Sequence, residues 1–61
     1  MDAADDVARA ARNLITAHGT VAETVALVRA KHAEESNRKE AARTWLGIAT
    51  AVSRLQGRMG R

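Results

Sequence analysis

The 61-residue chain has no cysteine and no proline, only four glycines, and tryptophan as its single aromatic residue. Without cysteine, no disulfide can stabilise so short a chain, and the thiolate ligands typical of structural zinc sites are missing. Without proline and with few glycines, little interrupts a helix, so we expect long helices joined by tight turns.

Long apolar runs are also missing, because no stretch approaches the roughly 18 residues that a membrane-spanning helix requires. Acidic residues follow Met1, where a secretory signal would have Lys or Arg. We therefore expect a cytoplasmic protein that makes no contact with a membrane.

Alanine makes up half of the apolar content: the chain has fourteen alanines and twelve larger aliphatic or aromatic residues, methionine aside. Alanine favours the helix but buries little area in a core. A chain of this length forms one domain with a thin core, over residues 1–61. We expect a second copy or another protein to supply the missing apolar area.

Apolar residues recur at helical spacing in three segments, which we predict to be helices at about residues 2–18, 20–33 and 37–56. Gly19 follows the first segment, where helices commonly end in a left-handed residue. Thr20 opens the second and is followed by Glu23, which is the pattern of a capping box. Asn37 opens the third, followed by a glutamate at the same spacing. The sequence predicts an all-α fold, a small three-helix bundle.

The boundary between the second and third helices has the weaker signal, because neither Ser36 nor Asn37 forces a helix to end. The alternative is that these two helices fuse into one long helix. Gly57 is expected to close the last helix, leaving residues 57–61 as a frayed basic tail.

Each predicted helix has one apolar stripe, which we expect to face the core. In the first helix the stripe is Ala4, Val7, Ala8, Ala11, Leu14 and Ile15. In the second it is Val21, Val25, Val28 and His32, beside a strip formed by Ala22, Ala26 and Ala33. In the third it is Ala41, Trp45, Ile48, Val52 and Leu55, beside Ala42 and Ala49. We expect Trp45 to fill the centre of the core; the alternative is an exposed anchor for a partner.

His18 and His32 are the only histidines in the chain, and neither belongs to a recognisable catalytic or metal-binding motif. Nucleophilic catalysis requires a nucleophile beside a base, and a zinc site requires three or four ligands. We therefore expect no enzymatic activity, cofactor, metal or small-molecule substrate. His18 is expected to lie at a helix C-terminus and His32 at the edge of the core.

Leu27 and Leu46 project away from the apolar stripes, among charged residues. Gly47, in the middle of the third helix, permits another helix to approach closely. We predict that Leu27, Leu46, Gly47 and Arg43 form an interface. The partner is a second copy, giving a dimer, or a larger protein that this chain regulates or inhibits.

The alternative function is that of a nucleic-acid-binding accessory protein. The net charge is +3, and the outer face of the third helix has a basic stripe of Lys39, Arg43, Arg54 and Arg58. Such a stripe favours contact with phosphates, although no aromatic residue lies among its charges. An ordinary solvated helix face explains the stripe as well.

Three stretches of the sequence together form a further pattern: Ala11-Arg12-x-Leu14-Ile15-x-x-His18-Gly19, then Arg29-Ala30, then Trp45-x-x-Ile48-x-x-Ala51-Val52-x-x-Leu55-Gln56. Over about residues 8–56, this pattern resembles a family of short bacterial helical proteins of unknown function. The resemblance implies no activity, cofactor or partner. The turn before the third helix departs from it, because Glu34-Glu35-Ser36-Asn37 stands where a glycine-rich turn is expected.

Overall fold

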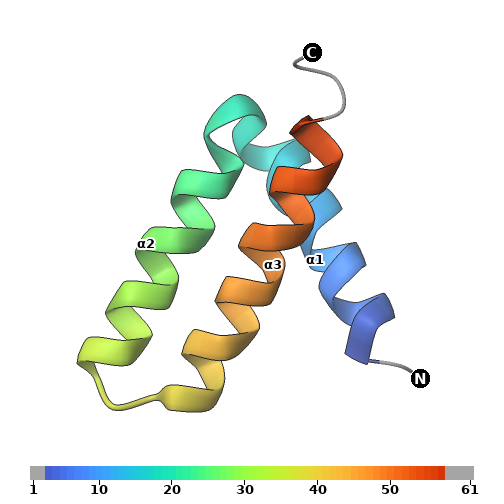
Figure 1. The fold of residues 1–61 in the computed structure, drawn as a ribbon. Helices are drawn as coiled ribbons and strands as arrows, with labels where there is room; N and C mark the ends of the chain where they lie inside the picture. The colour runs from blue at the N-terminus through green and yellow to red at the C-terminus, as the bar shows by residue number, and fades with distance from the viewer. Residues whose placement is uncertain (1–2, 58–61) are drawn as a thin grey trace.

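The computed structural model describes residues 3–57, and every one of them outside the short turn at 36–38 is helical. The elements are α1 (Ala3–His18), the 3-10 turn η1 (Gly19–Val21), α2 (Ala22–Glu35) and α3 (Lys39–Gly57). The all-helical class is confirmed over this range. Helical residues run without a gap from Ala3 to Glu35, and this run folds back on itself at η1 (Figure 1).

The junction between α1 and α2 differs from the predicted capping box. Gly19 has φ +61°, the left-handed conformation expected of the residue that follows a helix. The residue preceding α2 is Val21, which makes no side-chain cap, so Thr20 does not cap the helix. Instead the Ala22 amide donates to the Gly19 carbonyl, which also accepts a 2.6 Å hydrogen bond from Gln56 Nε2 at the end of α3.

The turn between α2 and α3 shows that these helices do not fuse, and it corrects the role of Asn37. Asn37 has φ +61° and follows the end of α2, where it closes that helix rather than opening the next. The Asn37 amide donates to the Glu34 carbonyl at 3.1 Å. The Arg38 amide donates to the Ala33 carbonyl at 2.7 Å, which completes a Schellman motif.

Both α2 and α3 begin two residues later than predicted. α2 begins at Ala22 and extends through Glu35, beyond the predicted end at residue 33. α3 begins at Lys39 rather than at residue 37. The predicted start of the first helix at residue 2 and the tail beyond Gly57 lie outside the described residues.

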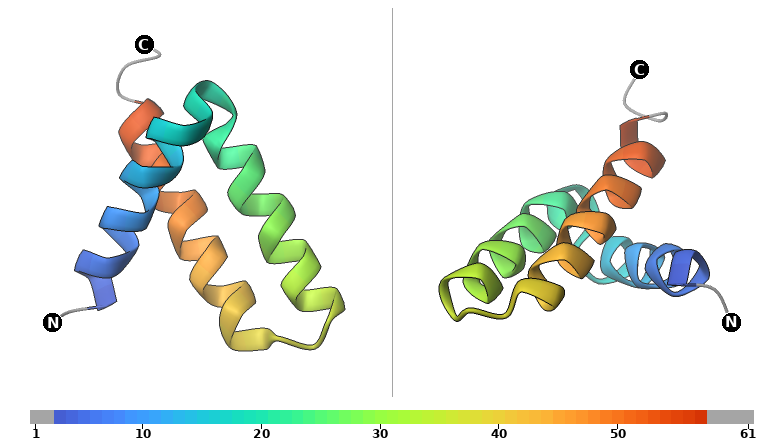
Figure 2. Two further views of the ribbon diagram at one scale, coloured as in Figure 1. Left: turned by 180° about the vertical axis from the view of Figure 1, so that it is seen from behind. Right: turned by 60° about the horizontal axis from the view of Figure 1, so that its bottom comes forward.

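The helices α2 and α3 run antiparallel and side by side, and α1 crosses behind the pair (Figures 1 and 2). α1 meets α2 near η1 and diverges from it toward the N-terminus. The main core therefore lies in the half of the molecule near η1, where all three helices contribute. It consists of Ala11, Leu14, Ala22, Ala26, Ile48, Ala49 and Val52.

The alanine strip beside the predicted valine stripe forms the buried face of α2, and of the valines in that stripe only Val25 packs against the core. The buried residues of α2 are Ala22, Ala26, Ala30 and Ala33. Val21 is 53% exposed and Val28 is 50% exposed. Small side chains allow two helices to approach closely, so alanines on α2 and the buried Ala42 and Ala49 of α3 pack with little space between the backbones.

Candidate interaction surfaces

The exposure expected of Leu27 and Leu46 is confirmed, and the two side chains share one surface. Leu27 on α2 is 45% exposed and Leu46 on α3 is 48% exposed. Two adjoining hollows of the α2–α3 pair are each lined by both leucines. The side that α1 does not cover therefore presents two large apolar side chains together, although they are nineteen positions apart in the sequence.

Charged residues surround these leucines in an ordered way. Near η1, Glu23 of α2 and Arg54 of α3 line the same hollow. Near the 36–38 turn, Glu34 of α2 lines a hollow with Lys39 and Arg43 of α3. We call this surface the leucine face; it comprises Leu27 and Leu46 together with Glu23, Lys31, Glu34, Lys39, Arg43, Thr50 and Arg54. Its α2 side carries both glutamates and Lys31, and its α3 side carries the other cations.

Gly47 does not belong to the leucine face, contrary to the prediction. A Cβ added at Gly47 would lie 4.0 Å from Cγ1 of Val7, so the helix that approaches it is α1 of the same chain. That separation is an ordinary van der Waals contact, which means that the packing leaves room for an alanine. The glycine therefore gives no support to an interface with a partner.

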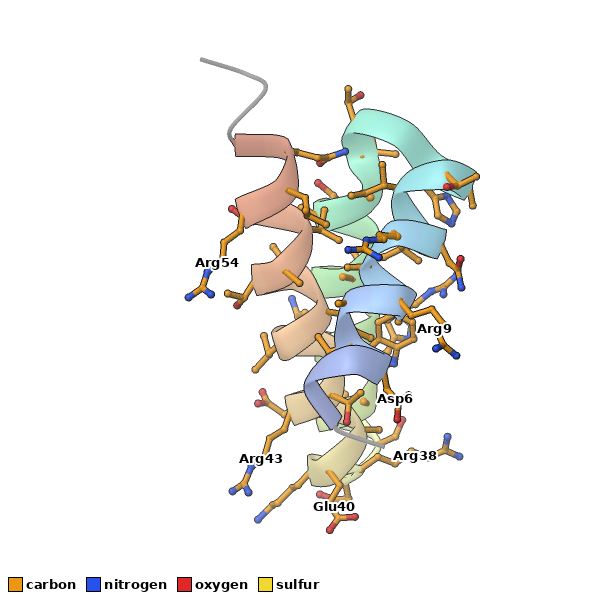
Figure 3. The ribbon with its side chains drawn as sticks, turned by 90° about the vertical axis from the view of Figure 1, so that its right-hand side faces the viewer. Asp6, Arg9, Arg38, Glu40, Arg43 and Arg54 are labelled. Carbon is orange, nitrogen blue, oxygen red and sulfur yellow. The ribbon has the colours of Figure 1, made fainter. Side chains whose placement is uncertain are left out.

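The basic stripe predicted for nucleic acid has glutamates of α2 beside it. Lys39, Arg43 and Arg54 are exposed, and Figure 3 shows Arg43 and Arg54 projecting from the same side of α3. The fourth residue, Arg58, lies outside the described residues. Glutamates of α2 line the same hollows as these cations. The Thr50 hydroxyl between them donates to the Leu46 carbonyl at 3.0 Å, so its proton is directed away from an incoming phosphate.

A further hollow lies on the opposite side of the α2–α3 pair, and it was not predicted from the sequence. It is lined by Val28, Arg29, His32, Ala33, Ser36, Arg38, Ala41 and Trp45, and we call it the turn-end groove. Figure 3 shows Arg38 pointing the opposite way from Arg43 and Arg54. In the sequence, Arg29 and His32 are an (i, i+3) pair, which predicts that they share one side of a helix. This pair indicates a basic groove only once the structure shows that Arg38 lines the same hollow.

We expected Trp45 to fill the centre of the core. Instead it is partly buried at the edge of the core. The largest side chain that is completely buried is Val52. One face of the indole is covered, because the Arg29 guanidinium carbon lies 5.1 Å from the ring centroid in a cation–π contact. Trp45 thus links the core to the turn-end groove.

Both histidines are exposed, which corrects the expectation that His32 lies at the edge of the core. His18 is in the last turn of α1, as predicted, and His32 lines the turn-end groove. Within residues 3–57, no three His, Asp or Glu side chains are placed to hold one metal ion. No helix in the same range is long and apolar enough to span a bilayer.

Comparison with known proteins found no matching family model, no similar curated protein and no similar solved structure. The resemblance to short bacterial helical proteins therefore stays a prediction.

Proposed function

We propose that this protein is a small, non-enzymatic, cytoplasmic interaction module of three packed helices that forms a two-fold dimer through the leucine face. The observation that carries the proposal is the placement of Leu27 and Leu46 side by side on the open side of the α2–α3 pair. Adjacent exposed apolar residues rimmed by charge are typical of protein interfaces. The alanine-rich core supports this, because it provides little buried apolar area per chain.

The charges on the leucine face favour one arrangement of the two copies. A two-fold axis parallel to α2 and α3 places α2 of each copy over α3 of its partner and keeps the η1 ends together. Glu23 then faces Arg54 of the other copy, and Glu34 faces Arg43. An axis perpendicular to the helices would place α2 over α2, with glutamate opposite glutamate. The first arrangement is therefore the dimer that we propose.

Reversing one charge at a time tests this arrangement. In Glu34→Arg and in Arg43→Glu, like charges face each other twice in a homodimer, so each variant is expected to dissociate at concentrations where the wild type is dimeric. In a mixture of the two variants, both contacts of the heterodimer become attractive again. Sedimentation equilibrium of each variant alone and of the mixture, at low and high salt, measures these states.

The control is Lys31→Glu, which changes a charge near Leu27 that the proposed pairing does not use. This variant is expected to dimerise like the wild type or slightly better. A wild type that stays monomeric up to millimolar concentration would contradict the dimer. So would a mixture of Glu34→Arg and Arg43→Glu that associates no better than either variant alone. In the first case, a larger protein that this chain regulates or inhibits would remain as the partner of the leucine face.

The alternative prediction, nucleic-acid binding along Lys39, Arg43 and Arg54, has less support because Glu23 and Glu34 lie beside these cations. We expect no specific binding of a DNA or RNA duplex, or of a single strand, at physiological salt. A sub-micromolar complex that weakens steeply with salt and is lost in a variant carrying both Arg43→Glu and Arg54→Glu would favour the alternative.

A further inference from the structure

The turn-end groove combines an apolar base with basic walls. Trp45, Ala41 and Val28 provide apolar surface, and Val28 is 50% exposed. Arg29, His32 and Arg38 line the same groove, and among the residues whose side chains the structure describes no aspartate or glutamate lines it. This differs from the leucine face, where cations and glutamates lie beside each other. An apolar groove with charge of only one sign is complementary to an acidic amphipathic ligand.

The position of the groove suggests the shape of that ligand. Near η1, α1 packs behind the α2–α3 pair, but it diverges from α2 toward the other end of the molecule (Figure 2). Of the α1 residues whose side chains the structure describes, none lines the turn-end groove. The α2–α3 pair therefore lacks a third helix at this end. A helix from another molecule bound here would pack on the pair as α1 does at the η1 end.

We propose that the turn-end groove binds an acidic amphipathic helix of another protein. Its apolar residues would cover Val28 and Trp45, and its carboxylates would accept hydrogen bonds from Arg29 and Arg38. Such charge-assisted bonds are among the stronger polar contacts in proteins. Single-stranded nucleic acid is disfavoured, because the Arg29 guanidinium already covers one face of the only aromatic ring that a base would stack on.

This proposal does not depend on the dimer, because the two surfaces lie on opposite sides of the α2–α3 pair and share no lining residue. The two are therefore testable separately. A Leu27→Glu/Leu46→Glu variant, designed to disrupt the leucine face, is expected to bind an acidic helix as tightly as the wild type does. Loss of the dimer with retained helix binding would leave the second proposal intact.

The probe is a fluorescein-labelled synthetic peptide of four or five helical turns, with leucines along one face, glutamates on both flanks and no aromatic residue. Binding is followed by anisotropy of the label. It is also followed by the emission of Trp45, which reports on this groove alone because the chain has no other tryptophan. The matched peptide has glutamine in place of every glutamate, which removes the charge but keeps a good helix former.

The groove variant is Arg29→Gln/Arg38→Gln, and its control is Arg43→Gln/Arg54→Gln, which removes the same charge from the opposite side. We expect the glutamate peptide to bind the wild type and the control alike and to shift the Trp45 emission. The groove variant is expected to weaken binding by about tenfold or more, because each arginine loses a charge-assisted hydrogen bond. Circular dichroism checks that each variant keeps its helix content.

Four results would overturn the proposal. The first is the absence of binding by the glutamate peptide, and the second is equal binding by the glutamine peptide. The third is equal weakening in the groove variant and in its control, which would mean that only net charge matters. The fourth is loss of the dimer in the groove variant, which would make a second copy of this chain the occupant of the groove.

Discussion

The two ends of this molecule are built differently. At the η1 end, α1, α2 and α3 share a core in which Leu14, Ile48 and Val52 are the large buried side chains. At the other end, near the 36–38 turn, α2 and α3 pack on Ala30, Ala33 and Ala42, which are buried but lie outside the main cluster. Three helices and large side chains hold one end, whereas two helices and alanines hold the other.

Two helices can pack in either of two ways: with their backbones close together, or farther apart with large side chains between them. Alanines let two backbones lie near each other, where many weak contacts add up. Where α1 crosses the α2–α3 pair, large side chains fill the wider space between the three helices. The alanine-only end buries less apolar surface per residue. That end also has the turn-end groove, where the uncovered flank of the pair remains accessible.

The largest effect is expected where the large side chains are. Leu14→Ala removes a side chain that is 8% exposed from the η1 end. We expect it to lower the free energy of unfolding by about 2–5 kcal/mol, because it leaves a cavity in the main core. Urea titration followed by circular dichroism measures this loss. Val21→Ala is the control: Val21 is 53% exposed, and its truncation should change stability by less than about 1 kcal/mol. Equal losses in the two variants would contradict a core centred at this end.

At the alanine end, adding volume is the sharper test. Ala30 is 4% exposed, and Ala30→Leu would force α2 away from α3. We expect this substitution to lower the free energy of unfolding by about 1–3 kcal/mol, as overpacking does in tight interfaces. Ala17→Leu, at an exposed position of α1, adds the same side chain without a clash and is expected to be nearly neutral. A fully stable Ala30→Leu variant would show that the alanines do not set the helix spacing.

The smallest effect is a gain in stability at Gly47. An added Cβ would meet only Cγ1 of Val7, at 4.0 Å, so Gly47→Ala is expected to raise the free energy of unfolding by about 0.5–1 kcal/mol through helix propensity. Gly19→Ala is the contrasting variant. Its Cβ would meet nothing within 4 Å, yet the φ of +61° makes alanine strained there, and thermal melting should show a loss. A loss of stability at Gly47 would instead mean that α1 packs more tightly on α3 than this distance allows.

The sequence predicted the all-helical class correctly and the helix ends less well, for a local reason. Gly19 marked a true helix end, because its left-handed conformation is one that few other residues adopt readily. Asn37 was ambiguous, because asparagine is favoured both before a helix and in the left-handed position after one. Only the backbone hydrogen bonds of the turn show that it closes α2.

The buried faces were harder to predict because they depend on distances between helices. In η1 and α2, hydrophobicity favoured Val21 and Val28 as core residues over the neighbouring alanines. The alanines are buried instead and these two valines are exposed, because small side chains allow α2 to pack closely on α3. Because the alanines of α2 face α3, Leu27 and Leu46 lie on one face of the pair. This could not be predicted for residues on separate helices. The turn-end groove was missed because its basic residues come from α2, the turn and α3 together.

The sequence alone was enough to predict that the chain is helical, that it turns near Gly19, and that Leu27 and Leu46 are exposed. These features depend on residues within a few positions of one another, through backbone preferences and helical periodicity. Only the tertiary structure decided that alanines are buried, that α1 covers Gly47, and that two surfaces of different charge lie on opposite sides. Alanine is compatible with both the core and the surface, so the spacing of the packed helices decides which of its positions are buried.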